Sequence, residues 1–260
     1  MSLTQAIHDA IAQIESTHDV RVLFAAESGS RAWGFASPDS DYDVRFIYVH
    51  RPDWYLSIGE PRDVIEAMLP GDLDLSGWDL RKALGLFMRC NLALNEWLGS
   101  PIVYQTRGDL ADQLRGLMPA GFRAPSGYHH YLHMAKGKYE ECVAQDPVRL
   151  KDVFYVLRPL LACRWIHHSG RQPPTEFARL AEAQWVDSSE RQMISALMAR
   201  KAAANESDRT ALDADTRAWF ERELETAQSA ASAIRSDASL ASSSLDELLR
   251  ATVKSTWSSD

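Results

Sequence analysis

The pattern of apolar and polar positions in the first part of the chain alternates between helix and strand. Apolar residues recur at helical spacing from Leu3 to Ile14, which predicts an amphipathic helix. Residues 20–26 are β-branched and apolar over the length of one strand, and residues 44–49 alternate in the same manner after a polar loop around Pro38. We therefore expect a helix followed by two strands.

A hairpin and another helix come next. Residues 62–69 and 73–76 are strand-like and flank the turn sequence Pro70-Gly71-Asp72. Asp79 then stands where a helix N-cap is expected, ahead of an apolar stripe at helical spacing. This stripe consists of Leu80, Ala83, Leu84, Phe87 and Met88.

The remainder of the chain favours helices, and we expect no strand after about residue 106. A clean helical stripe extends from Tyr128 to Cys142, and residues 150–166 are apolar enough to predict a buried central helix, with a kink or break at Pro159. Further helices are expected at 175–185, 188–204, 209–234 and 240–253. The prediction is an α+β fold, with a domain at residues 1–105 that contains a small mixed sheet and an all-helical domain at residues 106–260.

Charge and cysteine content narrow the classes of function. The chain of 260 residues has 28 Lys and Arg against 36 Asp and Glu, a net charge of −8, which argues against coating nucleic acid by bulk charge but allows a local basic groove. No apolar run approaches the roughly 18 residues that span a bilayer, and the N-terminus does not resemble a secretory signal. Three scattered cysteines are too few for a disulfide framework. We expect a cytoplasmic protein without a membrane partner.

The most informative stretch begins where the first strand ends. Gly29-Ser30 follows that strand and precedes an expected short helix, so main-chain N–H groups there are available to a phosphate oxygen. Glycine allows close approach of the ligand, and Ser30 adds a hydroxyl donor. Asp41 and Asp43 follow at the start of the next strand, and side chains two residues apart on a strand lie on the same face. The two carboxylates are therefore expected to point together.

Two carboxylates held together require a positive partner, and hard oxygen ligands favour Mg²⁺ or Mn²⁺. A pair of such ions binds a nucleoside triphosphate and activates an attacking hydroxyl. A third carboxylate on a neighbouring strand would complete the site. Asp74 is the preferred candidate, because Asp72 lies in the turn and Asp79 has a competing role as a helix cap. The choice between Asp74 and Asp79 stays open at this point.

The Gly-Ser pair, a spacer of about ten residues and Asp-x-Asp on a strand resemble the signature of the DNA-polymerase-β-like nucleotidyltransferase superfamily. Longer blocks resemble the RlaP family of predicted nucleotidyltransferases, an RNA-ligase-associated group that is also found alone. These blocks are ESGSRAWGFASPDSDYDVRFIY, SGWDLRKAL, NEWLGSPIVY and LRPLLACRWI, and the resemblance covers nearly the whole chain up to about residue 180.

The resemblance implies a nucleotidyltransferase fold and Mg²⁺ dependence. It also implies that Gly29 and Ser30 lie at the triphosphate and that Asp41 and Asp43 are metal ligands. Asp74 falls where the superfamily's third acid is expected. The family name suggests RNA repair, with RNA as one candidate acceptor.

Basic residues are the next candidates, because a triphosphate carries more negative charge than two metal ions neutralise. Lys151 and Arg158 are seven residues apart and so lie on one helix face, where each binds phosphate or forms a structural ion pair with Asp152 or Glu140. Arg31 and Arg45 flank the Gly-Ser pair and the acid pair. They either bind phosphate or neutralise the acids when no metal is present.

Other interpretations compete at three places. The run from Asp39 to Asp43 is also compatible with a solvated acidic loop, and Trp33 either stacks on a base or packs its loop against the sheet. His129 and His133 have a spacing that can hold zinc, but no third ligand is evident and packing or polar roles are favoured.

The function expected from the sequence is transfer of a nucleoside monophosphate from a triphosphate, ATP by default, to a hydroxyl of an unidentified acceptor. Asp41, Asp43 and Asp74 would be the catalytic and metal-binding residues. Gly29, Ser30, Arg31, Lys151 and Arg158 would bind the nucleotide. The alternatives are a nucleotide-binding regulatory module without turnover and an antitoxin-like enzyme that modifies a partner protein.

Overall fold

A computed structural model describes residues 2–59, 61–143 and 145–258 of the chain. They form two compact units. The first unit comprises residues 1–32, 41–121 and 239–260, and the second comprises residues 33–40 and 122–238.

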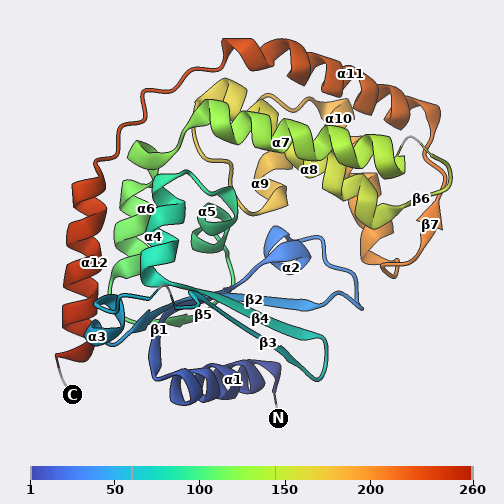
Figure 1. Cartoon of the computed structure of the whole chain (residues 1–260). Coiled ribbons are helices and arrows are strands. Elements are labelled where there is room, and N and C mark those ends of the chain that lie inside the picture. Colours follow the sequence, from blue (N-terminus) through green and yellow to red (C-terminus); the bar gives the residue numbers. More distant parts are fainter. Residues whose placement is uncertain (1, 60, 144, 259–260) are drawn as a thin grey trace. The chain divides into compact units, whose positions relative to one another are not determined.

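The first unit is built on a five-stranded mixed sheet with the order β3-β4-β2-β1-β5 (Figure 1). β2 and β4 are parallel, and the other neighbouring pairs are antiparallel. The strands are β1 (Val20–Glu27), β2 (Tyr42–His50), β3 (Val64–Leu69), β4 (Leu73–Asp79) and β5 (Val103–Thr106). The sheet and its helices confirm the expected α+β class, and the hairpin predicted around Pro70-Gly71-Asp72 is formed by β3 and β4.

Alternation along the strands gives the sheet two buried faces. Val44, Phe46 and Tyr48 of β2 belong to a core packed against α1 (Leu3–His18), whereas Ile47 and Val49 belong to a core on the opposite face. Figure 1 shows α1 on one side of the sheet and α4, α5, α6 and α12 on the other. Their bounds are Leu80–Met88 for α4, Leu92–Leu98 for α5, Leu110–Gly121 for α6 and Ser242–Trp257 for α12.

A local sequence signal accounts for the start of α4. The Asp79 side chain accepts a hydrogen bond from the Arg81 N–H and so caps α4, as predicted. The apolar stripe of α4 is buried at Leu80, Ala83, Leu84 and Phe87. Two short helices follow strands in this unit, α2 (Gly29–Trp33) and α3 (Pro52–Tyr55).

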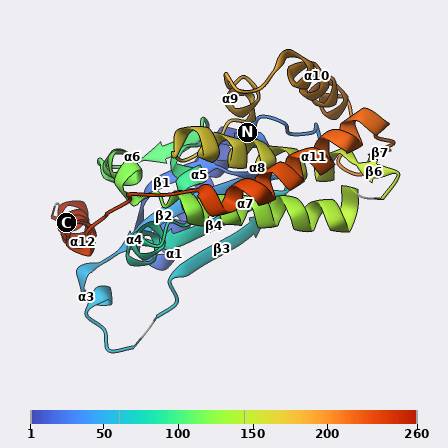
Figure 2. The ribbon, with the colours of Figure 1, turned by 90° about the horizontal axis from the view of Figure 1, so that it is seen from above.

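The second unit is mainly helical, and α7, α8 and α11 lie side by side in Figure 2. α8 is buried along most of its length and packs against α7, α9, α10 and α11. Its helices are α7 (Ala124–Lys138), a π-helical turn (Tyr139–Val143), α8 (Leu150–Ser169), α9 (Phe177–Ala181), α10 (Ser188–Ala202), α11 (Ala214–Ala230) and a 3₁₀ turn (Ala231–Ala233).

Two expectations for this region were wrong. Residues 148–149 and 209–210 pair as the short antiparallel strands β6 (Val148–Arg149) and β7 (Arg209–Thr210), although no strand was expected here. Two residues are too short a run to produce an alternating pattern. The expected break at Pro159 does not occur, since α8 continues from Leu150 to Ser169, and the alternative of a kink stays a prediction. Burial of the flanking apolar residues outweighs the hydrogen bond that proline removes.

Within the described ranges, none of the helices combines the length and the hydrophobicity needed to cross a lipid bilayer.

Candidate functional site

The Gly-Ser corner is joined directly to the strand that carries the acid pair. β1 ends at Glu27, and the Ser28 N–H donates to the main-chain oxygen of Asp43 at 2.8 Å. Gly29 has a φ of 63°, in the left-handed region, and a methyl group at this position would overlap Oδ2 of Asp43. Glycine is therefore required both by the backbone turn and by the close carboxylate. Ser30 follows in α2 and is 9% exposed.

Asp43 and Asp74 are direct neighbours across the parallel β2–β4 pair. Both side chains are about one-third exposed, at 32%. Arg45 lies between them, and its Nη2 donates to Asp43 Oδ1 at 2.7 Å and to Asp74 Oδ2 at 2.8 Å. Arg45 thus forms an ion pair with each of the two carboxylates.

The alternative third acid, Asp79, is engaged elsewhere. Its carboxylate is fully buried, caps α4 and accepts a hydrogen bond from the Tyr55 hydroxyl at 2.7 Å. Burial raises the pKa of Asp79, against the hydrogen bond from Tyr55 and the main-chain bond from Arg81, which lower it. Of the two carboxylates that the sequence left open, Asp74 is the one beside Asp43.

Asp41 is exposed and directly precedes β2. The Arg31 Nε donates to the Asp41 main-chain oxygen at 3.0 Å, and the guanidinium lies 3.7 Å from the centre of the Tyr42 ring. Arg31 therefore holds the backbone from which Asp41 projects. The metal-binding role of Asp41 and the nucleotide-binding role of Arg31 stay predictions.

Glu27 binds the backbone of Asp43 and was not predicted from the sequence as a site residue. It is fully buried, and its Oε1 accepts the Asp43 N–H at 2.8 Å while Oε2 accepts the Tyr104 hydroxyl. Burial raises the pKa of this carboxyl, and the bonds from Tyr104 and Asp43 act in the opposite direction. A carboxylate at the end of an otherwise apolar strand, directly before Gly-Ser, is the signal that could have identified it.

The carboxylate oxygens of Asp43 and Asp74 are candidate ligands of a metal ion. Among the residues that the structure describes, no three His, Cys, Asp or Glu side chains form a group that could hold a metal ion. Asp43 and Asp74 nevertheless present adjacent carboxylates to one positive group, Arg45, which is the donor chemistry that a hard divalent cation requires. The two carboxylates are therefore the type of ligand that such an ion prefers.

Lys151 lines a cavity of about 380 Å³ within the second unit, together with Lys138, Arg149, Asp152, Tyr155, Glu206 and Ser207. Asp152 is buried and binds Arg149 at 2.8 and 3.2 Å and Lys138 at 3.4 Å. Burial alone would raise the pKa of Asp152, but the Arg149 hydrogen bond and the Lys138 charge lower it. Asp152 therefore stays ionised and orients two cations along the cavity wall.

Lys151 itself pairs with Glu206 at 2.6 Å, a partner that the sequence did not suggest. Arg158 does not line this cavity. It is 2% exposed, and its guanidinium lies 4.4 Å from the centre of the Trp33 ring. Trp33 also packs near Tyr155, at a ring distance of 5.5 Å, so these contacts are with α8 and not, as one interpretation expected, with the sheet. The phosphate-binding roles of Lys151 and Arg158 stay predictions.

The acidic loop before β2 is anchored within the second unit. The Glu206 N–H donates to Asp39, and the Ser40 hydroxyl donates to the Glu206 carboxylate at 2.8 Å. Lys201 is buried and donates to the Ser37 hydroxyl. Asp39 thus has a structural partner, whereas Asp41 and Asp43 belong to the first unit.

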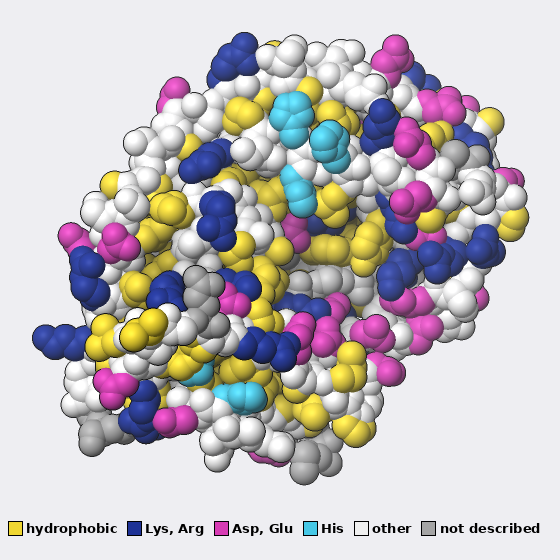
Figure 3. Space-filling model, in the orientation of Figure 1, with side chains coloured by type: hydrophobic (Ala, Val, Ile, Leu, Met, Phe, Trp, Pro, Cys, Tyr) yellow, Lys and Arg dark blue, Asp and Glu magenta, His cyan; other side chains and the backbone are white. Residues whose placement is uncertain are grey.

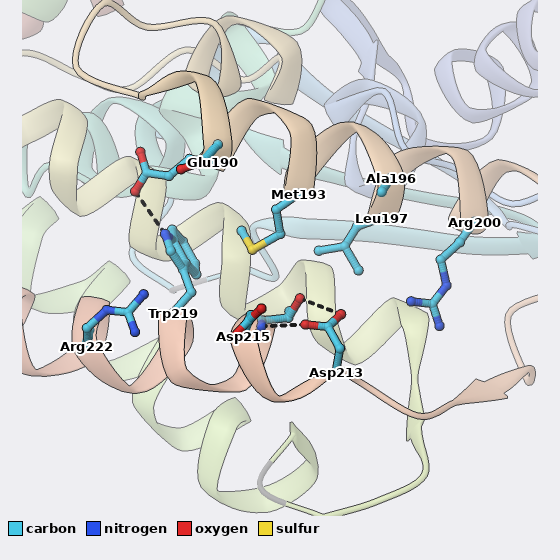
Figure 4. A pocket seen from close by; sticks show the side chains of 11 residues that line it. Glu190, Met193, Ala196, Leu197, Arg200, Asp213, Asp215, Trp219 and Arg222 are labelled. Atoms are coloured by element: carbon cyan, nitrogen blue, oxygen red, sulfur yellow. Dashed lines mark hydrogen bonds between the residues drawn. The ribbon is translucent and has the colours of Figure 1, made fainter.

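A second cavity in the helical unit, of about 360 Å³, lies between α10 and α11 (Figure 4). Met193, Leu197 and Trp219 line its middle, and Arg200 and Arg222 stand at opposite ends. None of the residues that the sequence proposed for catalysis or nucleotide binding lines it. On the molecular face drawn in Figure 3, positive and negative side chains are mixed.

Neighbouring carboxylates on two parallel strands, beside a glycine corner on a small mixed sheet, agree with the nucleotidyltransferase-like fold that the sequence resemblance implies. The chain belongs to the RlaP family, described as an RNA repair pathway DNA polymerase beta family, whose sequence profile matches residues 3–251. The match extends well beyond residue 180, where the resemblance seen in the sequence blocks ended.

Two similar proteins illustrate this relationship. The uncharacterized protein YcgL of Bacillus subtilis strain 168 is 40% identical over 255 residues, which cover 98% of each chain. A nucleotidyltransferase-like protein from Exiguobacterium sibiricum, known from a crystal structure, is 13% identical, with a TM-score of 0.31 over 86% of this chain and 75% of that one.

Proposed function

We propose that the protein is a metal-dependent nucleotidyltransferase that moves a nucleoside monophosphate from a triphosphate to an acceptor hydroxyl. The observation that carries this proposal is the position of Asp43, which neighbours Asp74 across parallel strands and faces the Gly29 corner. Membership of the RlaP family supports it independently.

In this reaction the acceptor oxygen forms a bond to the α-phosphorus, and the bond from that phosphorus to the bridging oxygen of the β-phosphate breaks. Pyrophosphate leaves, and the acceptor hydroxyl loses its proton. Asp74 is the proposed group that orients this hydroxyl and receives the proton, because it is partly exposed and stands beside Asp43. Gly29, Ser30 and Arg31 are proposed to bind the triphosphate.

Asp41, Asp43 and Asp74 are the proposed ligands of Mg²⁺ or Mn²⁺. When bound, such an ion neutralises phosphate charge and lowers the pKa of a coordinated hydroxyl. In the second unit, the cavity lined by Lys138, Arg149 and Lys151 has the charge to bind phosphate groups. Arg149 is an addition to the residues that the sequence suggested.

The proposal also names the nucleotide and the acceptor. ATP is the default donor, and the family description, an RNA repair pathway, favours an RNA end as the acceptor hydroxyl. Such substrates are found in the cytoplasm, the compartment expected from the sequence.

The test is pyrophosphate release by the purified protein with each nucleoside triphosphate, Mg²⁺ and a panel of RNA ends. Release that depends on both metal and acceptor is the expected result. Asp43→Asn should lower it to background, because the amide keeps the shape of the carboxylate but loses its charge. Asp63→Asn removes a carboxylate that pairs with Lys82 in the same unit and should leave release unchanged. Full activity of Asp43→Asn would refute the assignment.

One observation favours a second candidate, a nucleotide-binding module without turnover. Arg45 pairs with both Asp43 and Asp74, so the two carboxylates have a counter-charge within the protein itself. Calorimetry with ATP in the presence and absence of Mg²⁺ separates the two functions. Tight binding with no pyrophosphate release over the full acceptor panel would favour the binding module.

A further inference from the structure

We propose that Arg45 is a resident counter-ion that a divalent cation must displace from between Asp43 and Asp74. This inference rests on the proposed function, because it concerns the metal ion that those carboxylates are proposed to share. It assigns Arg45 a positioning role: the guanidinium holds the two carboxylates in place and sets how tightly the ion is bound.

This inference rests on the position of Nη2 of Arg45. Nη2 of Arg45 bonds both carboxylates, at 2.7 Å to Asp43 and 2.8 Å to Asp74, and so occupies the point that a bridging cation would take. Nη1 donates to the main-chain oxygens of Val44 and Asp74, each at 3.2 Å. These two bonds fix the guanidinium across β2 and β4.

Charge explains why a divalent ion would compete successfully. Two carboxylates and one guanidinium leave a net charge of −1, which a doubly charged ion in place of the guanidinium would neutralise. The Arg45 side chain is 19% exposed, so the position can be reached from solvent. The guanidinium and a metal ion exclude each other from the same point, and each would repel the other at short range.

The two carboxylate oxygens of Asp43 have different neighbours. Oδ1 binds Arg45, whereas Oδ2 is the atom that lies against the Gly29 corner. An ion bound on the Oδ2 side would leave Arg45 in place. An ion bound between Oδ1 and Asp74 would have to replace the Arg45 guanidinium. Arg45 is therefore expected to lower the affinity for this ion and not for one bound on the Oδ2 side.

The experiment measures Mn²⁺ binding by calorimetry to the full-length protein without nucleotide. Arg45→Gln removes the competing charge and is expected to bind the weaker Mn²⁺ ion at least tenfold more tightly than the wild type. Without divalent ions this variant should unfold at a lower temperature than the wild type, and Mn²⁺ should raise its unfolding temperature by more. Arg62→Gln, which removes an arginine from the exposed pair with Glu66, is the control and should match the wild type.

Equal Mn²⁺ affinities of wild type and Arg45→Gln would overturn the inference, because Arg45 would then be a permanent clip between strands. If Arg45→Gln does not fold, Arg45→Lys keeps one charge without the forked geometry and should bind Mn²⁺ more tightly than the wild type; an unchanged affinity would again overturn it. Failure of every variant to bind Mn²⁺ would reject the proposed metal dependence as well. Tighter binding by the variant without pyrophosphate release from the wild type would reject only the proposed transferase function.

Discussion

Asp43 owes its position to three neighbouring residues, each of which contacts a different part of it. The Glu27 carboxylate binds its N–H, Arg45 binds one side-chain oxygen, and the absence of a side chain at Gly29 leaves space for the other. The geometry of the proposed catalytic acid is thus set by short contacts on all sides.

Gly29→Ala should therefore reduce activity and stability together. The left-handed φ of 63° costs a residue with a Cβ about 1–2 kcal/mol, and the added methyl overlaps Asp43. Displacement of a catalytic group by about 1 Å lowers rates by about 100-fold. Chemical denaturation and pyrophosphate release measure the two effects.

Gly108→Ala is the matched control, since Gly108 has a φ of 67° with no atom within 4 Å of an added methyl. It should lose similar stability but keep its activity. Equal loss of activity in both variants would show that backbone strain, and not the contact with Asp43, is responsible.

His50 predicts a pH dependence of folding. Its ring stacks on Trp54 at 4.1 Å, and burial, assisted by the charge of His18, lowers its pKa to about 4. Between that pH and about 6.5 the unfolded chain binds a proton at this position and the folded protein does not, so the free energy of unfolding falls as the pH falls through this range.

Denaturation of the wild type and His50→Gln at pH 7 and pH 4 tests this effect. The stability advantage of the wild type over the variant should shrink at the lower pH, because the variant has no proton to bind. A difference between the two proteins that stays constant with pH would contradict the assignment.

The candidate site was predictable from sequence only in part. The i, i+2 spacing brought Asp41 and Asp43 into consideration, and alternation in the hairpin selected Asp74, whose position beside Asp43 the structure shows. Glu27 was missed because one of its partners, Tyr104, is distant in sequence. Arg149 pairs with Asp152 only three residues away, but the cavity that both line also includes Glu206, which is distant in sequence. Spacing along one segment carries no information about such partners.

At the scale of elements, one parallel strand pair brings the two halves of the acid site together. β2 and β4 are separated by α3 and β3, yet their register sets Asp43 against Asp74. The strands and the longer helices were predictable because their apolar residues recur with the period of the element. The parallel pairing was not, since it is decided by tertiary packing, and α8 passes Pro159 for the same reason.

α12 is the element that returns from the end of the chain to cover the sheet. Leu248 of this helix is 6% exposed and lies in the same core as Leu84 and Ile47. Leu248→Ala should lower the free energy of unfolding by about 2–5 kcal/mol, because truncation leaves a cavity in that core. Denaturant titration of the purified variant measures the loss.

Glu247→Ala changes the neighbouring exposed position on α12 and should alter stability by no more than about 0.5 kcal/mol. Near wild-type stability of Leu248→Ala would show that α12 is dispensable for the sheet core.

For the molecule as a whole, chain order and packing do not coincide. The sequence suggests one division at residue 105, whereas residues 106–121 and the C-terminal helix pack with the sheet, and residues 33–40 pack with the helical unit. Local patterns locate elements but not the unit that each one joins, because that choice depends on contacts between distant segments. The segment joining the Gly-Ser corner to Asp41 therefore belongs to the helical unit.

The central claim is transfer of the α-phosphoryl group with its nucleoside, and parallel reactions with α-labelled and γ-labelled ATP test it most directly. The protein, Mg²⁺ and a cell extract supply every candidate acceptor, whether RNA, protein or metabolite. The account predicts that the α-label becomes covalently attached to an acceptor while the γ-label leaves as pyrophosphate, and that Asp43→Asn attaches neither. Attachment of the γ-label, or ATP binding with no attachment of either label, would contradict it.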